Sequence, residues 1–477
     1  MSSMNAPAAE IAHQLAELDA AFALQRAAFR GSPNPQAGER RLHLTSLCRL
    51  LRENADAMAA AISSDFGHRS VHETRVLEIF PSLQGARHAA ARVAKWMRPE
   101  RRPVSIWFQP GRARVVKQPL GVVGVIVPWN YPLYLAAGPL VSALAAGNRV
   151  LIKMSEFTPI FGRLFEQLAG RYFSRDQVAV INGGVEVAQA FAGKPFDHLL
   201  FTGSTAVGRQ VMRAAAENLT PVTLELGGKS PAIVAPGFPI DVAARRIMLG
   251  KCLNAGQTCI APDYVLLPEA QMQAFIDAAL DEVRQLYPGG VASADYSAII
   301  DARHYGRLQR CLEDAAGKGA RAVVLSGGAS ESARKFAPTI VTGVNDSMRI
   351  MQEEIFGPLL PLVGYRDLDQ ALDYVANRPR PLALYYFDPD TERIKRVLDE
   401  SIAGGVTIND TIFHIAQDAL PFGGVGNSGM GHYHGEEGFN TFSKRKGVFL
   451  QSRWNGAWML KPPFGQRIER LLKFMLR

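Results

Sequence analysis

The sequence predicts an α/β fold with two parallel-sheet domains and a separate β-strand arm. The chain has 477 residues, 47% of them hydrophobic, which is enough for roughly two to three domains. From residue 121 onward, β-branched apolar runs alternate with helix-length segments, and the alternation restarts after residues 223–235. Strands that alternate with helices imply right-handed crossovers, and therefore doubly wound parallel sheets.

The first domain is expected to begin with helices and to continue as strand–helix units. Residues 6–30 are rich in alanine, and residues 38–64 carry leucines at helical spacing. The run 121–128 is β-branched with Gly and Pro at its edges, which predicts a buried strand. Similar strands are expected at 149–153, 177–181 and 198–202, with helices at 134–146, 159–172 and 185–193 between them.

The second alternation predicts a second α/β domain. Its helices are expected near 241–255, 270–286 and 301–316, and its strands near 321–326, 358–364, 382–387 and 405–409. Two segments fit neither domain. Residues 104–119 predict a hairpin that turns at Pro110-Gly111, and residues 438–452 end in another strand. A dimer in which these strands cross between subunits would explain both segments.

Composition excludes several classes of protein. The net charge is +9, but the basic residues are scattered, so a solvated basic face is favoured over nucleic-acid binding. Four cysteines in a chain of this length do not form a disulfide framework, and no spacing of Cys or His indicates a metal site. The first residues show no signal-peptide pattern, and no apolar run is long enough to span a membrane. We therefore expect a cytoplasmic protein.

Two glycine motifs could bind a nucleotide, and only one has the right context. The run GVGNSG at 424–429 does not follow a strand or open a helix, so it predicts a tight loop instead. The run FTGSTAVG at 201–208 follows a strand that ends at Thr202, and a helix is expected to begin near Ser204. Backbone N–H groups at such a helix start attract a pyrophosphate. The turn at Gly203 and Ser204 is therefore the candidate, although many such turns bind nothing.

The stretch CLNAGQTCIA at 252–261 raises the question of whether Cys252 or Cys259 is a working thiol. A thiolate that attacks a carbonyl creates an oxyanion, which needs a fixed hydrogen-bond donor, and a carboxylate must later activate water. Asn130 and Glu225 stand at the ends of expected strands and could supply these groups. Spacing alone leaves open whether they converge, and a lone cysteine is more often a packing residue.

Seven motifs resolve this question by resemblance. They are PWNYP (128–132), KMSEFTP (153–159), FTGST (201–205), LELGGKSP (224–231), NAGQTC (254–259), EEIFGP (353–358) and PFGG (421–424). Their order resembles that of the aldehyde dehydrogenase superfamily, from about residue 15 to 451. The run from residue 420 to 446 looks most like the class 3 branch, and within it like bacterial coniferyl-aldehyde dehydrogenases. The expected fold is thus a Rossmann-type NAD domain, a second α/β catalytic domain and a β-strand oligomerisation arm.

The resemblance also implies a role for each matching residue. Cys259 would be the nucleophile, Asn130 the oxyanion donor together with the N–H of Cys259, and Glu225 the base. Cys252 matches no functional position and is expected to be a packing residue. The cofactor-binding positions would be Lys153 and Glu156 at the adenosine ribose, Gly203 and Ser204 at the pyrophosphate, and Glu354 and Phe356 at the nicotinamide ribose and ring.

These roles imply oxidation of an aldehyde to a carboxylic acid through a thiohemiacetal and a thioester, with no metal. Glu156 would accept hydrogen bonds from a ribose 2′-hydroxyl and repel a 2′-phosphate, which favours NAD, with NADP as a second acceptor. Coniferaldehyde is suggested by the branch, and medium or long aliphatic aldehydes are alternatives. Two other functions remain open: an acylating dehydrogenase that uses coenzyme A, and a silent binding protein on the same fold. Trp129 and Tyr131 are expected to be packing or tunnel wall, and His414 core or rim.

The chain can be divided on these grounds. Residues 1–103 and 120–226 would form the NAD-binding domain, 227–410 the catalytic domain, 104–119 with 438–452 the arm, and 453–477 a C-terminal tail. Within the tail, residues 462–477 predict a short basic amphipathic helix, with its apolar positions opposite Arg467, Arg470, Lys473 and Arg477. The helix is expected to dock on the protein, by resemblance on a partner subunit near the substrate entrance, rather than on a membrane surface. A homodimer is expected.

Overall fold

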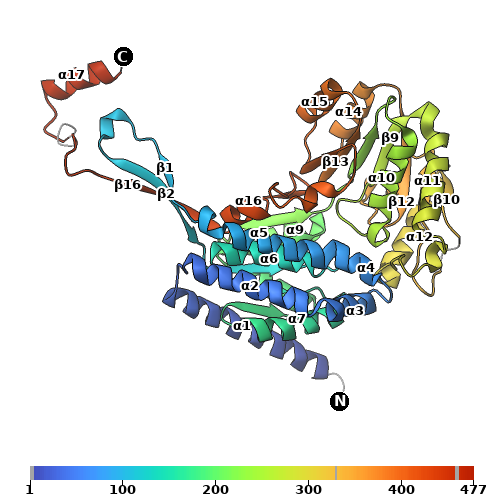
Figure 1. The fold of residues 1–477 in the computed structure, drawn as a ribbon, viewed down its shortest axis with the longest axis horizontal. Helices are drawn as coiled ribbons and strands as arrows, with labels where there is room; N and C mark the ends of the chain where they lie inside the picture. The colour runs from blue at the N-terminus through green and yellow to red at the C-terminus, as the bar shows by residue number, and fades with distance from the viewer. Residues whose placement is uncertain (1–4, 328–329, 457–460, 477) are drawn as a thin grey trace.

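The computed structural model describes residues 5–327, 330–456 and 461–476. Two bodies, each built around a β-sheet, lie side by side, and a thin arm projects from one of them (Figure 1). The predicted α/β architecture with two largely parallel sheets is confirmed. Arg477, which the sequence assigned to the basic face of the tail, and the N-terminal residues 1–4 lie outside the described residues.

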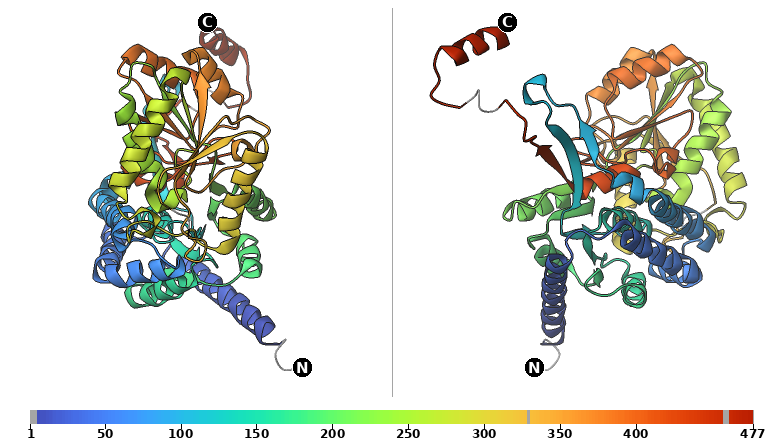
Figure 2. Two further views of the ribbon diagram at one scale, coloured as in Figure 1. Left: turned by 90° about the vertical axis from the view of Figure 1, so that its right-hand side faces the viewer. Right: turned by 60° about the vertical axis from the view of Figure 1, so that its left-hand side comes forward.

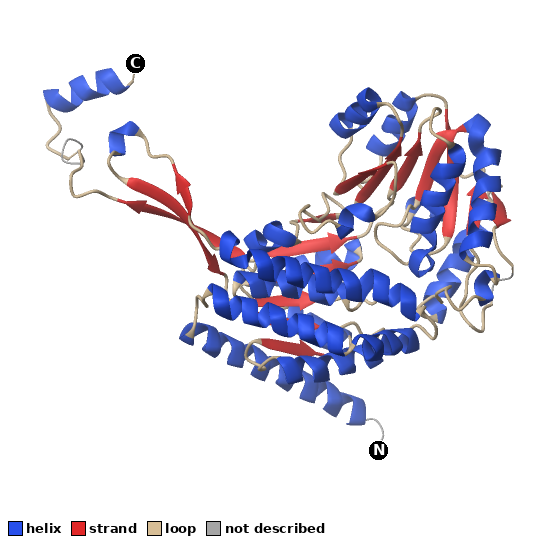
Figure 3. Cartoon of the chain, in the orientation of Figure 1, coloured by secondary structure: helices blue, strands red, loops and turns tan. Residues whose placement is uncertain are grey.

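The first sheet has six strands in the order β15-β7-β6-β3-β4-β5. Neighbours from β7 to β5 pair in parallel, and β15 is antiparallel to β7, with Gly429 opposite Glu225. The bounds are β3 Val122–Ile126, β4 Arg149–Lys153, β5 Val178–Ile181, β6 His198–Gly203, β7 Val222–Leu226 and β15 Gly429–Met430. All of β3 is buried because helices cover both faces of this sheet (Figure 3).

Helices around the first sheet form two apolar layers. Side chains of β3 point alternately to the two faces of the sheet and pack into two different hydrophobic clusters. Val123 and Val125 belong to one cluster, and Val122 and Ile126 belong to the other. The helices are α1 Asn5–Gly31, α2 Ala37–Glu53, α3 Ala55–Asp65, α4 Val71–Thr74, the π-helix η1 Arg75–Ile79, α5 Phe80–Trp96, α6 Tyr134–Ala146, α7 Pro159–Tyr172, α8 Val185–Ala192, α9 Thr205–Ala216 and α16 Gly435–Thr441. The predicted bounds of α6 and α7 agree with the structure.

One predicted helix is wrong. The stretch 38–64 divides into α2 and α3 at Asn54, whose φ of −122° is not helical. Its Nδ2 donates to the Leu50 carbonyl at 2.9 Å, so the asparagine side chain satisfies a carbonyl at the end of α2. Leucine spacing continues across the break, which is why periodicity alone predicted one helix.

The second sheet has seven strands in the order β10-β11-β12-β9-β8-β13-β14. Only β10, at one edge, is antiparallel to its neighbour. The strands are β8 Pro231–Val234, β9 Tyr264–Pro268, β10 Arg321–Val324, β11 Thr339–Thr342, β12 Leu359–Tyr365, β13 Ala383–Phe387 and β14 Gly405–Ile408. The α-helices are α10 Ile240–Cys252, α11 Met272–Leu286, α12 Ala302–Gly317, α13 Arg349–Gln352, α14 Leu368–Ala376 and α15 Thr391–Glu400. Short 3₁₀ turns are η3 Leu253–Gly256, η4 Glu269–Gln271, η5 Gly290–Ala292 and η6 Phe413–Ala416.

The arm is a three-stranded antiparallel sheet of β1 Glu100–Arg102, β2 Arg112–Pro119 and β16 Ser443–Leu450. It extends away from both bodies (Figure 2). The strand expected within residues 438–452 is present as β16, but the expected hairpin at 104–119 differs, because its first strand is 100–102. Residues 106–108 form a 3₁₀ turn, η2 (Ile106–Phe108), instead. Pro103 and Pro110 flank this turn and have no N–H to offer a strand ladder.

The tail carries α17, Gln466–Met475, within the segment predicted to be helical. This helix lies near the tip of the arm and far from both bodies (Figure 1). The ring of Phe474 meets that of Trp107 in η2 at a centroid distance of 6.1 Å. Most of the apolar face remains exposed, and Leu476 is 83% exposed. Among the described helices, none combines the length and apolar character needed to cross a membrane.

Candidate active site

Cys259 follows a left-handed turn at the end of α10. Asn254 and Ala255 both have φ near 52°, and Gly256 has φ of 75°. A Cβ at Gly256 would lie 2.3 Å from the Gly357 carbonyl oxygen, so only glycine fits there. The turn places Cys259 at the boundary of a cavity, where its side chain is partly exposed.

Asn130 lies just beyond the end of β3 and is bonded to the cysteine turn in two ways. Its Nδ2 donates to the Gln257 carbonyl at 3.1 Å, and its own carbonyl accepts from Asn254 Nδ2 at 3.0 Å. A side-chain amide has two N–H groups. One Asn130 N–H is therefore engaged by the turn, and the other remains for a ligand.

Glu225 is the last residue but one of β7 and lines the same cavity. Its side chain is buried, and neither carboxylate oxygen has a hydrogen-bond partner in the protein. Burial without partners penalises the charged form, so the pKa of the Glu225 carboxyl lies well above its ordinary value. GVGNSG, which the sequence predicted to be a tight loop, runs beside this residue and pairs Gly429 with Glu225.

The main cavity has a volume of about 320 Å³. It is lined by Pro128, Trp129, Asn130, Thr202, Gly203, Ser204, Glu225, Leu226, Gly227, Cys259, His304, Arg307, Glu354 and Phe356. The structure thus brings together the three predicted catalytic residues and four of the predicted cofactor residues: Gly203, Ser204, Glu354 and Phe356.

Lys153 and Glu156 do not line this cavity but lie at the same edge of the sheet. Lys153 is the last residue of β4, and it pairs with Ile126 of β3. Its Nζ donates to the Met154 and Gly183 carbonyls, both at 2.7 Å. Burial lowers the pKa of this amine to about 8. Glu156 is exposed.

The cavity fits a dinucleotide at the carboxyl ends of the parallel strands β3, β6 and β7, where α/β sheets bind such ligands. Ser204 is the N-cap of α9, so the free N–H groups at the start of this helix are available to bind an anion such as a pyrophosphate. Glu354 supplies a buried oxygen, Oε1, without a protein partner. Burial and, to a lesser extent, nearby Asp263 raise the pKa of Glu354 to about 8.

A second, apolar pocket of about 70 Å³ reaches Cys259. It is lined by Leu77, Tyr131, Tyr134, Leu135, Gly250, Leu253, Thr258, Cys259, Ile260, Ile412 and Ile415. Cys259 is the residue that lines both spaces. A thiol between a polar cavity and an apolar pocket can meet a cofactor from one space and an apolar substrate from the other.

The two cysteines of the stretch have different surroundings. Cys252 is 1% exposed and belongs to the core, as expected of a packing residue. Burial raises the pKa of the Cys259 thiol to about 12, with further contributions from Glu354 and then Glu225. Cys259 therefore needs a proton acceptor before it can act as a nucleophile.

Two cavity residues lie outside all of the motifs quoted from the sequence. His304 is in the first turn of α12, and its ring lies 5.1 Å from that of Trp129. Arg307 donates to the carbonyls of Glu354 and Ile355, so it holds the segment that carries Glu354. The sequence predicted this helix, but no periodic signal shows that its N-terminus faces the cavity.

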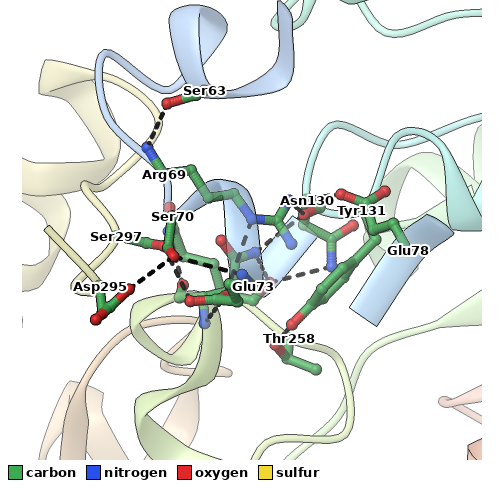
Figure 4. Close-up of polar contacts among 12 residues, drawn as sticks. Ser63, Arg69, Ser70, Glu73, Glu78, Asn130, Tyr131, Thr258, Asp295 and Ser297 are labelled. Atoms are coloured by element: carbon green, nitrogen blue, oxygen red, sulfur yellow. Dashed lines mark hydrogen bonds and ion pairs between the residues drawn. The ribbon is translucent and has the colours of Figure 1, made fainter. Parts of the chain in front are cut away.

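The aromatic neighbours lie where packing or wall residues were expected. Trp129 lines the main cavity, with its ring 5.3 Å from that of Phe356. Tyr131 lines the apolar pocket, and its hydroxyl is 2.7 Å from Thr258 Oγ1 (Figure 4). His414 is buried and stacks on Phe422, and burial lowers its pKa to about 4. It contacts Thr407 Oγ1 through Nδ1 and lines neither space.

A cavity at the carboxyl ends of parallel strands, joined to an apolar pocket through a cysteine, is the arrangement expected of a dehydrogenase that uses a thiol. The profile of the Aldehyde dehydrogenase family matches residues 5–448, and the chain belongs to this family. It is an NAD(P)-dependent enzyme that oxidises aldehydes to carboxylic acids. The comparisons support neither the acylating nor the silent alternative.

Similar proteins agree with this assignment. The chain is 56% identical over 459 residues to a probable coniferyl aldehyde dehydrogenase of Pseudomonas aeruginosa, covering 96% of each chain. A substrate-bound structure of Staphylococcus aureus AldH has a TM-score of 0.91 at 37% identity, covering 96% of this chain and 99% of that one. An aldehyde dehydrogenase of Mycobacterium tuberculosis in complex with NAD+ has a TM-score of 0.84 at 29% identity, covering 92% and 91%. The predicted family and its coniferyl-aldehyde branch are confirmed.

Proposed function

We propose that the enzyme oxidises coniferaldehyde and related aldehydes with apolar tails, and that Cys259, Asn130 and Glu225 carry the reaction. One observation supports this proposal above all others: Cys259 lies where the main cavity and the apolar pocket meet. A carbonyl carbon at Cys259 can have its tail in the apolar pocket while its hydrogen faces the cofactor cavity.

The first step is addition of Cys259 to the aldehyde. Glu225 takes the thiol proton, the sulfur bonds to the carbonyl carbon, and the carbonyl oxygen becomes an oxyanion. The free N–H of Asn130 and the backbone N–H of Cys259 donate to this oxygen. NAD(P)+, whose nicotinamide Glu354 and Phe356 would hold, would supply the acceptor for a hydride from the same carbon, and loss of that hydride would leave a thioester on Cys259.

The second step is hydrolysis of the thioester. Glu225 first releases the thiol proton to solvent and then removes a proton from a water molecule that attacks the acyl carbon. The carbon–sulfur bond breaks, the carboxylic acid leaves, and the proton on Glu225 returns to the Cys259 sulfur. The unpartnered state of the Glu225 oxygens supports this role, because nothing in the protein competes with the water for them.

The cofactor is held by Lys153, Glu156, Gly203, Ser204, Glu354 and Phe356, with NAD preferred over NADP. The exposed carboxylate of Glu156 at the end of β4 favours a 2′-hydroxyl over a 2′-phosphate. The preference is measured as the ratio of kcat/KM values for the two cofactors at saturating aldehyde. A ratio that favours NADP would contradict it.

The substrate assignment rests on the apolar pocket and on the similarity to a probable coniferyl aldehyde dehydrogenase. The test is NADH formation with coniferaldehyde, cinnamaldehyde, decanal and acetaldehyde, with and without coenzyme A. We expect kcat/KM for coniferaldehyde to exceed that for acetaldehyde by about 100-fold, since apolar burial of a ring is worth several kcal/mol. Equal values would overturn the substrate class, and a requirement for coenzyme A would overturn hydrolysis.

The arm is proposed to pair two subunits of a cytoplasmic homodimer. Apolar side chains near its tip are exposed, Ile106 by 79% and Phe449 by 48%. We expect sedimentation to give twice the chain mass of 52.0 kDa, and Ile106→Glu to shift the protein toward monomer. A monomeric parent protein at micromolar concentration would contradict the dimer.

The proposed NAD-binding domain consists of residues 1–103 and 120–226, and the proposed catalytic domain of residues 227–410. The division between them lies in the connection between β7 and β8, where the chain passes from the first sheet to the second.

The tail 453–477 is proposed to dock on the partner subunit rather than on a membrane. Deleting residues 462–477 should leave co-sedimentation with anionic liposomes unchanged. A parent protein that sediments with liposomes while the truncated one does not would favour the membrane.

A further inference from the structure

Three buried charged side chains contact the segments that carry Asn130 and Cys259. The proposed reaction uses none of them directly. Arg69, Glu73 and Glu78 come from one short segment around α4 and η1 (Figure 4). The side chains of Arg69 and Glu78 are 0% exposed, and that of Glu73 is 7% exposed. We refer to these three residues as the charge cluster.

Arg69 connects the cluster to the oxyanion donor. Its Nη1 donates to the Asn130 carbonyl at 3.2 Å and to Glu78 Oε1 at 2.7 Å. Its guanidinium also lies over the ring of Tyr131, 4.8 Å from the centroid. Asn130 thus has its carbonyl fixed by Arg69 and its neighbouring residue packed against the same cation.

Glu78 connects the cluster to the start of α6. Its Oε2 accepts from the backbone N–H groups of Leu133 at 2.8 Å and Tyr134 at 3.1 Å. These are the free donors of a helix N-terminus, which a carboxylate satisfies well. The segment between Asn130 and α6 is therefore held at both of its ends by one ion pair.

Glu73 connects the cluster to the cysteine turn. Its Oε1 accepts from the N–H of Asn254 at 2.5 Å, and its Oε2 from Ser297 Oγ at 3.2 Å. Asn254 is the first residue of the left-handed turn, where a non-glycine residue is strained. Glu73 lies 3.9 Å from Arg69 Nε, so one cation serves both carboxylates.

Stability alone does not explain this arrangement. Two buried carboxylates share one guanidinium, and Arg69 Nε and Nη2 have no hydrogen-bond partner. Burying charges is costly, and apolar residues of similar size often replace a buried ion pair without loss of stability. What the cluster does supply is a rigid link between two loops from different domains, each of which carries one reacting group.

We propose that Arg69, Glu73 and Glu78 are positioning residues that hold the Asn130 amide and the Cys259 turn in one fixed arrangement. The inference rests on the proposed roles of Asn130 and Cys259. Arg69 acts through Asn130, and Glu73 acts through Asn254. A misplacement of about 1 Å at such groups can reduce the rate about 100-fold.

A double-mutant cycle tests the link between Arg69 and Asn130. Arg69→Met, Asn130→Ala and the double variant are compared by kcat/KM for coniferaldehyde, with NADH affinity measured by fluorescence. We expect Arg69→Met to lower kcat/KM about 30-fold in the parent but less than about 3-fold in the Asn130→Ala enzyme. NADH affinity should stay within about 2-fold. Equal losses in both backgrounds would overturn the proposal.

Arg40 supplies a matched control. It is also a buried arginine that binds carbonyls of α6, those of Ala145 at 3.1 Å and Ala146 at 2.6 Å, but at the end of the helix remote from Asn130. Arg40→Met should change kcat/KM by the same factor in both backgrounds. If instead it reproduces the pattern of Arg69→Met, general loosening of the fold explains the result and the proposal fails.

Two further outcomes keep the test decisive. If Arg69→Met does not fold, Arg69→Lys takes its place in the same cycle, because lysine keeps the charge but not the planar guanidinium; equal losses in both backgrounds would again overturn the proposal. If Asn130→Ala alone leaves kcat/KM unchanged, the assigned role of Asn130 fails, and so does the proposed function on which the inference rests.

Discussion

Two groups of residues that line the main cavity are held in opposite ways; we call Asn130 and Cys259 the fixed wall, and Glu225 and Glu354 the free wall. The wall with Asn130 and Cys259 is held by hydrogen bonds from several segments, including those of Arg69 and Glu73 (Figure 4). The wall with Glu225 and Glu354 contains buried carboxylate oxygens that have no hydrogen-bond partner in the protein. The pKa values of both carboxyls are raised by burial.

The difference separates groups that must stay fixed from groups whose protons or partners change. A donor for an oxyanion acts by being preorganised, so the protein immobilises it. A base must gain and lose a proton at neutral pH, so the protein leaves its oxygens free and adjusts its pKa. Changes to the fixed wall should therefore affect geometry, and changes to the free wall should affect proton transfer.

The largest effect is expected at the thiol of Cys259. Cys259→Ala should lower kcat at least about 10⁴-fold, since removal of a nucleophile removes the covalent pathway. Cys252→Ala is the matched control, because this buried cysteine contacts neither space, and it should keep activity within about 2-fold while losing some stability. The measurement is NADH production with coniferaldehyde. Full activity in Cys259→Ala would contradict the mechanism.

A large effect is also expected on the free wall. Glu225→Gln should lower steady-state turnover about 100-fold, in the usual range for loss of a general base. If acylation remains faster than hydrolysis, stopped-flow absorbance will show a burst of NADH followed by a slow phase. Unchanged steady-state turnover would show that another group activates the water.

A smaller effect is expected from straining the fixed wall. Gly256→Ala adds a Cβ that would lie 2.3 Å from the Gly357 carbonyl oxygen, at a residue with φ of 75°. Displacement of the turn should lower kcat about 10-fold to 100-fold with little change in NADH affinity. Gly447→Ala, in the arm where a Cβ meets nothing within 4 Å, serves as the control. Equal kinetics in the two variants would show that the turn tolerates movement.

The smallest effect is on stability as a function of pH. A carboxyl with a raised pKa keeps its proton in the folded protein, so its favourable contribution is present at pH values below the unfolded pKa of about 4.3 and is lost as pH rises through the folded pKa. Glu225→Gln removes this loss. The melting temperature of the variant relative to the parent should therefore rise by about 2 °C between pH 6 and pH 8.5. A constant difference across this range would contradict the raised pKa.

Sequence reasoning succeeded where local patterns are strong. Helices α6 and α7 and the strand–Gly–helix turn at Ser204 follow directly from apolar runs flanked by Gly and Pro. Ordered motifs identified seven of the residues that line the main cavity, but neither His304 nor Arg307. The charge cluster was missed because Arg69, Glu73 and Glu78 look like a solvated helix surface in the sequence. Only the tertiary structure shows that their segment is enclosed between the two bodies. Likewise, only the tertiary structure shows that His304, at the start of α12, lines the main cavity.

The apolar pocket is formed by side chains from segments distant in sequence, among them Leu77, Leu135 and Ile412. By contrast, hydrogen bonds from the side chains of Glu73 and Asn130 to the backbone, together with one obligatory glycine, shape the turn beside it. Substitutions of these pocket side chains can thus accumulate without displacing the turn that carries Cys259. An ancestral enzyme of this architecture could have explored new aldehydes one pocket residue at a time, and a directed-evolution library confined to these positions should yield altered selectivity at little expense in turnover.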